Sequence, residues 1–75
     1  DPGLWYLLAE VQGLAGNIVG LHQSRAEFFI LHGNLDEAEK QLNYALGLSQ
    51  TDYQISEIVY QRLKDVQNIR AKLDN

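Results

Sequence analysis

Apolar residues recur along this chain at the spacing of amphipathic helices in four consecutive segments. In the first segment, about residues 3–15, the apolar stripe consists of Leu4, Leu8, Val11 and Ala15, widened by Trp5, Leu7 and Leu14. Asp1 and Pro2 suit a helix start, since Asp caps the first turn and Pro lacks an N–H that this turn leaves unpaired. Gly16 predicts the end of the helix because glycine readily adopts the left-handed conformation found there.

The second predicted helix covers about residues 18–31, with Asn17 as its cap and its end at His32–Gly33. Its bulky residues are Ile18, Leu21, Phe28, Phe29 and Ile30, and Ala26 offers a point of close approach for a neighbouring helix. Gly20 lowers the helix propensity locally.

The third predicted helix covers about residues 35–48, and Asn34 with Glu37 has the spacing of a capping box. One face carries Leu35, Ala38, Leu42 and Ala45, whose alanines allow a second helix to dock closely. On the other face, Asp36 and Lys40 have the spacing of a favourable ion pair.

The last predicted helix is the longest and covers about residues 52–73, with Thr51 and Gln54 as a second capping-box candidate. Its expected buried stripe is Ile55, Val59, Val66, Ile69 and Leu73, with Ile58 and Leu63 beside it. Short loops between helices predict antiparallel neighbours, and no segment alternates with the period of a strand. We therefore expect one all-α domain over residues 1–75.

Two turns in the chain have the same local sequence at a fixed distance. Gly16 and Gly33 lie seventeen residues apart, and each is followed by Asn and an apolar residue. Seventeen is half the period of the tetratricopeptide helix–turn–helix repeat. The chain resembles that repeat at its first helix through Trp5, Leu8, Ala9 and Gly16, and at its turn and second helix through Gly33, Leu35, Ala38, Leu42 and Ala45. The resemblance implies about two repeats, with the long last helix as a cap.

Two different sets of helices could form the inner, concave face of such an array. Ala26, Phe29 and Gly33 in the second helix also fit the first-helix pattern, so the register can be offset by one helix. The run from Trp5 to Ala9 is the clearest first-helix signature and favours helices one and three as the inner pair. Gln12 stands where the repeat usually has an aromatic residue, and Gln50 stands where it usually has a closing proline.

A longer resemblance extends over nearly the whole chain. The segments Leu7–Glu10, His22–Phe29, Gly33–Ala38 and Gln41–Leu46 are similar to the C-terminal tail of bacterial HExxH zinc peptidases coupled to tetratricopeptide repeats, as in the β-barrel assembly-enhancing protease family. This resemblance implies a periplasmic parent protein that acts in outer-membrane protein assembly and quality control. Zinc would belong to the parent's peptidase domain, and the start at Asp1 without Met leads us to expect a piece of a larger protein.

Composition and charge disfavour some classes of partner. Residues 1–61 carry a net charge of −6 and residues 62–75 one of +2, which together make the −4 of the chain. An acidic body disfavours nucleic acid, and the basic end suits a helix C-terminus. The uncharged run from Val11 to Ser24 is too polar to insert into a membrane, and no signal-peptide pattern is present. There is no cysteine for a thiolate site.

No catalytic, cofactor or metal site is predicted. His22 is followed by Gln23, with Ala26 where HExxH requires its second histidine. His22 and His32 lie roughly 15 Å apart along a helix, which is too far for a shared metal ion. Asp36, Glu37 and Glu39 lie at a helix start, where acidic residues favourably oppose the helix dipole.

The expected partners are proteins or peptides, or the peptidase domain of the parent itself. If helices one and three line a concave face, then Tyr6, Glu10, Lys40 and Tyr44 project into it, whereas Trp5, Phe28 and Phe29 serve the core. The alternative is a purely structural role, in which the last helix caps a longer repeat array with Arg62, Lys64, Asp65 and Gln67 as its polar face, or a generic tetratricopeptide scaffold with no link to a peptidase. The pattern makes no prediction of oligomeric state.

Overall fold

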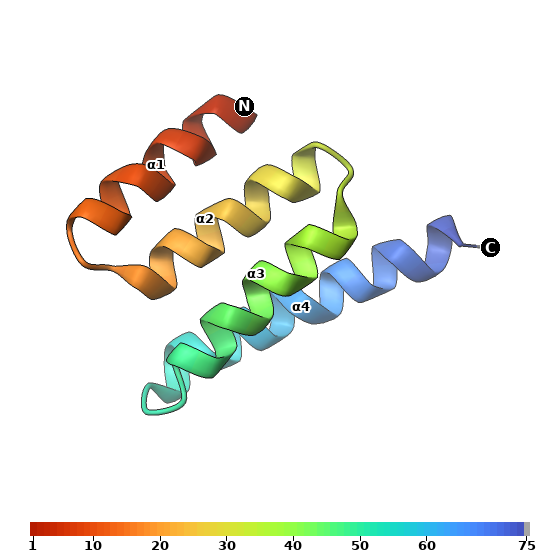
Figure 1. Cartoon of the computed structure of the whole chain (residues 1–75). Helices are drawn as coiled ribbons and strands as arrows, with labels where there is room; N and C mark the ends of the chain where they lie inside the picture. The colour runs from red at the N-terminus through yellow and green to blue at the C-terminus, as the bar shows by residue number, and fades with distance from the viewer. Residues whose placement is uncertain (75) are drawn as a thin grey trace.

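The protein consists of four α-helices joined by short turns (Figure 1). In a computed structural model that describes residues 1–74, the helices are α1 (Pro2–Leu14), α2 (Ile18–Leu31), α3 (Leu35–Leu48) and α4 (Tyr53–Leu73). No strand occurs within residues 1–74, so the all-α prediction is confirmed. None of the helices within this range is long and apolar enough to cross a membrane.

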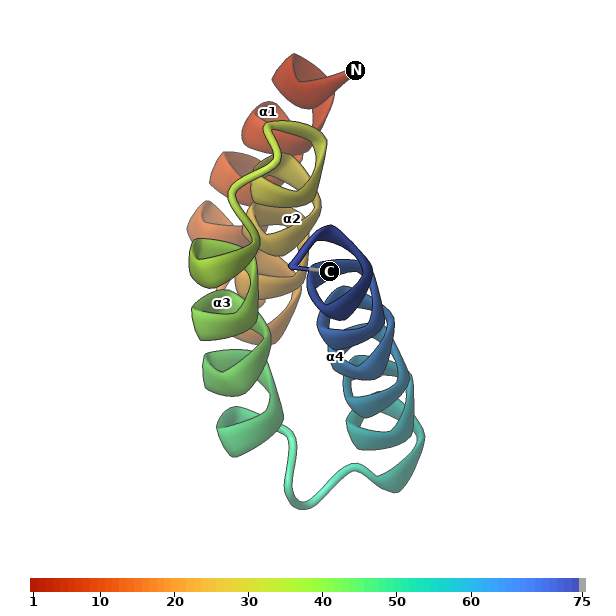
Figure 2. The same cartoon turned by 90° about the vertical axis from the view of Figure 1, so that its right-hand side faces the viewer.

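The helices form a flat molecule of 40 × 28 × 14 Å. Helices α1, α2 and α3 lie side by side, with α2 in the middle (Figure 1). Helix α4 turns back behind α3, on one side of this three-helix layer (Figure 2). Each helix therefore packs chiefly on the one before it, as the short loops predict.

The turns after α1 and α2 have the same backbone geometry. Gly16 and Gly33 have φ angles of +81° and +75°, which an L-residue adopts only with strain. The next residue donates its N–H back into the preceding helix, from Asn17 to the Gln12 carbonyl at 2.8 Å and from Asn34 to the Phe29 carbonyl at 2.9 Å. Both are Schellman motifs, so the repeated Gly-Asn pair reflects a repeated structural device.

The asparagines that end one helix also begin the next. Asn17 accepts a hydrogen bond from the Gly20 N–H at 3.0 Å, and Asn34 accepts one from the Glu37 N–H at 3.3 Å. The prediction of Thr51 as the cap of the last helix is wrong. Asp52 caps α4 by accepting from the Ile55 N–H at 3.1 Å, since its carboxylate lies three residues before that N–H.

The core lies between α2, α3 and α4. Its fully or almost fully buried apolar residues are Ala26, Leu35, Ala38, Leu42, Ala45, Val59, Leu63 and Val66. The whole predicted apolar face of α3 is therefore buried. Trp5, Phe28 and Phe29 are only half-buried, because α1 covers α2 from one side alone.

The predicted stripe of α4 is wrong at its C-terminal end, where Ile69 and Leu73 are exposed. With 21 residues against 14 in α3, α4 extends past the helix that covers it (Figure 1). Ile58 is also exposed, whereas Leu63 is buried.

The predicted pair of Asp36 and Lys40 does not form. Lys40 instead lies 3.4 Å from Glu37, and Asp36 pairs with Arg70 of α4. Arg70 also pairs with Glu39. Asp36 and Glu39 therefore pair with α4, because α4 lies across the start of α3.

Candidate interaction groove

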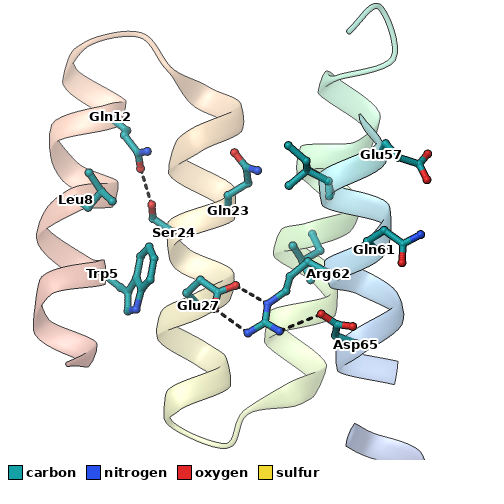
Figure 3. Close-up of a pocket in the computed structure, with 13 residues that line it drawn as sticks. Trp5, Leu8, Gln12, Gln23, Ser24, Glu27, Glu57, Gln61, Arg62 and Asp65 are labelled. Carbon is teal, nitrogen blue, oxygen red and sulfur yellow. Dashed lines mark hydrogen bonds and ion pairs between the residues drawn. The ribbon is translucent and has the colours of Figure 1, made fainter. Parts of the chain in front are cut away.

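A groove of about 590 Å³ lies between α1 and α4, above α2 (Figure 3). Helix α1 forms one wall, α4 forms the other, and α2 forms the floor. Its lining residues are Trp5, Leu8, Gln12, Gln23, Ser24, Glu27, Leu42, Glu57, Ile58, Val59, Gln61, Arg62 and Asp65. The groove exists because α4 covers the α2–α3 side of the layer and leaves the α1–α2 side open.

An ion-pair network holds the α4 wall to the floor. Arg62 donates from Nε and Nη2 to both carboxylate oxygens of Glu27, at 2.8 and 2.9 Å, and from Nη1 to Asp65 at 3.2 Å (Figure 3). The hydrogen bond with Glu27 is the main cause that raises the pKa of Arg62 above its ordinary value. Such two-pronged pairing fixes orientation as well as distance, so it sets the width of the groove.

The α1 wall combines apolar and polar contacts. Trp5 and Leu8 line the groove from α1, and Ile58 lines it from α4. At its base, a 2.6 Å hydrogen bond joins the Ser24 hydroxyl to the Gln12 amide (Figure 3). Gln12 thus ties α1 to α2.

Two of the four predicted partner-binding residues line a different cavity. Tyr6 and Glu10 belong to a smaller hollow of about 120 Å³ between α1 and α2, together with Arg25 and Phe28. The Tyr6 and Phe28 rings lie 5.9 Å apart. No residue of α4 lines this hollow, so it lies away from the groove.

The other two predicted residues lie on α3. The Tyr44 ring lies 5.2 Å from the ring of His22, and Lys40 pairs with Glu37. Neither residue lines the groove or the smaller hollow. Helices α1 and α3 flank α2 instead of packing closely on each other, so the four residues do not meet in one cavity.

The predicted repeat positions divide between the turns, the core and the groove. Gly16 and Gly33 form the turns, and Ala26, Ala38 and Ala45 are fully buried. Ala9 is also buried, and Phe29 packs against the core from a half-buried position. Trp5, Leu8 and Leu42 line the groove.

Each of the two histidine rings contacts a neighbouring side chain of the fold. His22 Nδ1 lies 2.7 Å from the Gln41 side-chain oxygen, and the His32 ring lies 4.4 Å from that of Phe28. Within residues 1–74, no group of three His, Cys, Asp or Glu side chains lies close enough to hold a metal ion.

Comparisons with protein-family models, with curated proteins and with solved structures found no significant match.

Proposed function

We propose that this chain is a non-catalytic protein-interaction module whose groove between α1 and α4 binds a segment of a partner protein. The groove itself is the observation that carries the proposal. It has about 590 Å³ of space that the chain does not fill, and its walls expose Trp5, Leu8 and Ile58. Exposed apolar side chains around a shaped concavity are typical of binding sites.

The polar lining favours a polypeptide as the bound molecule. The amides of Gln12, Gln23 and Gln61 carry both donors and acceptors, which match the N–H and C=O groups of a backbone. The apolar walls accept side chains, and the exposed Glu57 favours a basic residue at the rim. Polypeptide recognition commonly combines an apolar pocket with such a polar rim.

A finer proposal rests on the family resemblance. On that basis the chain is the tetratricopeptide tail of a periplasmic HExxH zinc protease, and its partner is a substrate or assembly protein of the outer membrane, or the peptidase domain of the same parent. Any zinc belongs to that domain. If this proposal is correct, the gene encodes an HExxH motif upstream of the codon for Asp1, and a gene without one contradicts it.

The groove can be tested with a displayed library of helical and extended peptides, selected against the wild-type chain. We expect selected peptides to shift the fluorescence of Trp5, which is the only tryptophan and lines the groove. Ile58→Glu, which places a charge on the apolar α4 wall, should weaken binding at least about 10-fold. Its thermal unfolding should match that of the wild type because Ile58 is exposed.

Two control variants show whether a selected peptide binds in the groove. Leu48→Glu introduces the same charge at an exposed α3 site outside the groove and should leave peptide affinity unchanged. The double variant Tyr6→Ala, Tyr44→Ala removes the two tyrosines outside the groove. Binding that is lost in this double variant but retained in Ile58→Glu would place the site at the Tyr6 or Tyr44 side chain and overturn the groove proposal.

A structural capping role is the second candidate. Helix α4 covers the α2–α3 side of the layer, and Lys64, Asp65 and Gln67 on it are exposed, as the terminal helix of a repeat array requires. In this case Ile58→Glu leaves both folding and association unchanged, and no library peptide is selected.

A further inference from the structure

The face of α1 that points away from α2 is apolar and has no partner in the structure. Leu4, Leu7, Val11 and Leu14 are 65%, 60%, 61% and 90% exposed. Among the described residues 1–74, helix α1 packs closely only on α2. Four neighbouring apolar side chains at such exposure are uncommon on a small soluble domain and indicate an interaction surface. We call these four residues the α1 seam.

The four residues form a single straight stripe. Their spacing of three, four and three residues is the heptad spacing that keeps apolar side chains on one side of a helix. The residues that face α2 lie on the other side, since Ala9 is buried there and a side chain at Gly13 would lie within 2.8 Å of Leu21. One side of α1 is thus used within the chain and the other is free.

The seam is complementary to itself in the antiparallel direction. Because the spacing reads the same in both directions, a second copy of α1 running antiparallel places Leu4 opposite Leu14 and Leu7 opposite Val11. This is the arrangement of a two-fold interface, in which each residue pair occurs twice. The stripe contains no charged residue, so two copies meet without electrostatic repulsion at its centre.

We propose that two copies of this chain associate through the α1 seam as an antiparallel, two-fold symmetric pair. Eight seam side chains, with the half-exposed Leu8 beside them on each copy, bring the buried surface to about 1,000 Å², the lower limit for a specific interface. The pair should therefore be a weak dimer with a dissociation constant in the micromolar range. Leu8 also lines the groove, whereas none of the four seam residues does, so a dimer covers the groove lining at Leu8 and leaves its other lining residues outside the interface.

Sedimentation velocity of the wild-type chain, from about 1 μM to about 1 mM, tests the pair over the range where weak association is visible. We expect a reversible shift from monomer to dimer. Leu7→Glu places two carboxylates within the buried seam and should keep the chain monomeric throughout. Leu48→Glu adds the same charge at an exposed α3 site and should dimerise as the wild type does. Circular dichroism should show the same helix content in all three proteins.

A mixing experiment tests the antiparallel direction. Leu7→Glu and Val11→Lys should each be monomeric alone, because each places a charge opposite an apolar residue. Mixed in equal amounts they should form a heterodimer, since Glu at 7 of one copy then faces Lys at 11 of the other. A parallel pair places position 7 opposite position 7 and gives no such rescue. A wild type that stays monomeric at 1 mM, a Leu7→Glu dimer, or a mixture without heterodimer overturns the proposal.

Discussion

Gly20 is unfavourable for helix formation, yet the structure has no room for a side chain at this position. Glycine lowers helix propensity, yet Gly20 is buried where α1 and α2 come close together. An added Cβ would lie 2.7 Å from the Gln12 amide nitrogen and 2.8 Å from Asn17 Cγ. Asn17 has little freedom to move, because its oxygen accepts the N–H of Gly20 and caps α2.

Gly20→Ala should therefore destabilise the protein although alanine is the better helix former. Displacement of the Asn17 cap costs about 1–2 kcal/mol, and together with the steric overlap at Gln12 this exceeds the gain in helix propensity. Gly47 is the matched control, since it lies in α3 with nothing within 4 Å of an added Cβ. Gly47→Ala should stabilise the fold by about 0.5–1 kcal/mol. Urea denaturation measures both changes, and equal effects of the two substitutions would contradict this account.

The packing of α3 depends on small side chains at fixed positions. Ala38 and Ala45 are fully buried against their neighbours, together with Ala26 of α2. Alanine at these points lets helices approach, because a larger side chain would require either a longer helix separation or a strained rotamer.

Ala45→Leu should cost about 1–3 kcal/mol of unfolding free energy through overpacking of this contact. Ala71→Leu adds the same atoms at an exposed position in α4 and should change stability by less than about 0.5 kcal/mol. Thermal unfolding followed by circular dichroism distinguishes the two. A stable Ala45→Leu variant with unchanged helix packing would show that the α3 contact has room that the structure does not indicate.

Helix α4 is held to the layer by its buried Val59, Leu63 and Val66 and by the Arg62–Glu27 pair. Solvent reaches part of this pair, as the Arg62 side chain is 36% exposed and that of Glu27 is 23% exposed. Screening therefore limits its contribution, although the two parallel hydrogen bonds improve its geometry.

A double-mutant cycle of Glu27→Ala and Arg62→Ala should give a coupling free energy of about 1 kcal/mol, the upper end for partly exposed pairs. The cycle of Glu37→Ala and Lys40→Ala is its control, because that single hydrogen bond on one exposed helix turn should couple by no more than about 0.5 kcal/mol. Chemical denaturation of the seven proteins, the wild type with two single variants and one double variant for each pair, supplies both values. Equal couplings would show that the Arg62 network does not fix the position of α4.

The helices and turns could be predicted from the sequence because their signals are local. Gly16 with Asn17 and Gly33 with Asn34 end and start helices through contacts within a few residues. The groove could not be predicted in the same way, since Glu27 and Arg62 are 35 residues apart in the sequence and meet only when α4 folds back. The exposure of Ile69 and Leu73 likewise depends on where α3 begins, since the C-terminal part of α4 lies there, and not on the apolar pattern of α4.

In the molecule as a whole, the hydrophobic core lies among the last three helices of the chain. All eight residues of the central cluster come from α2, α3 and α4, and α1 adds only the buried Ala9. A 75-residue domain with so few buried large side chains is near the limit of independent stability. The α1 seam adds four further apolar side chains that the fold leaves exposed.

Thermal unfolding should therefore be cooperative and modest, with a Tm well below the hyperstable range that begins at about 90 °C. Because dimerisation through the α1 seam stabilises only the folded chain, Tm should rise with protein concentration, by about 3 °C for each tenfold increase above the dissociation constant. Leu7→Glu should unfold at a Tm independent of concentration, whereas Leu48→Glu should retain the rise. Differential scanning calorimetry over two decades of concentration measures this. A wild-type Tm that does not change with concentration would mean that α1 contributes no intermolecular burial and that the contacts within one chain alone account for the stability of the fold.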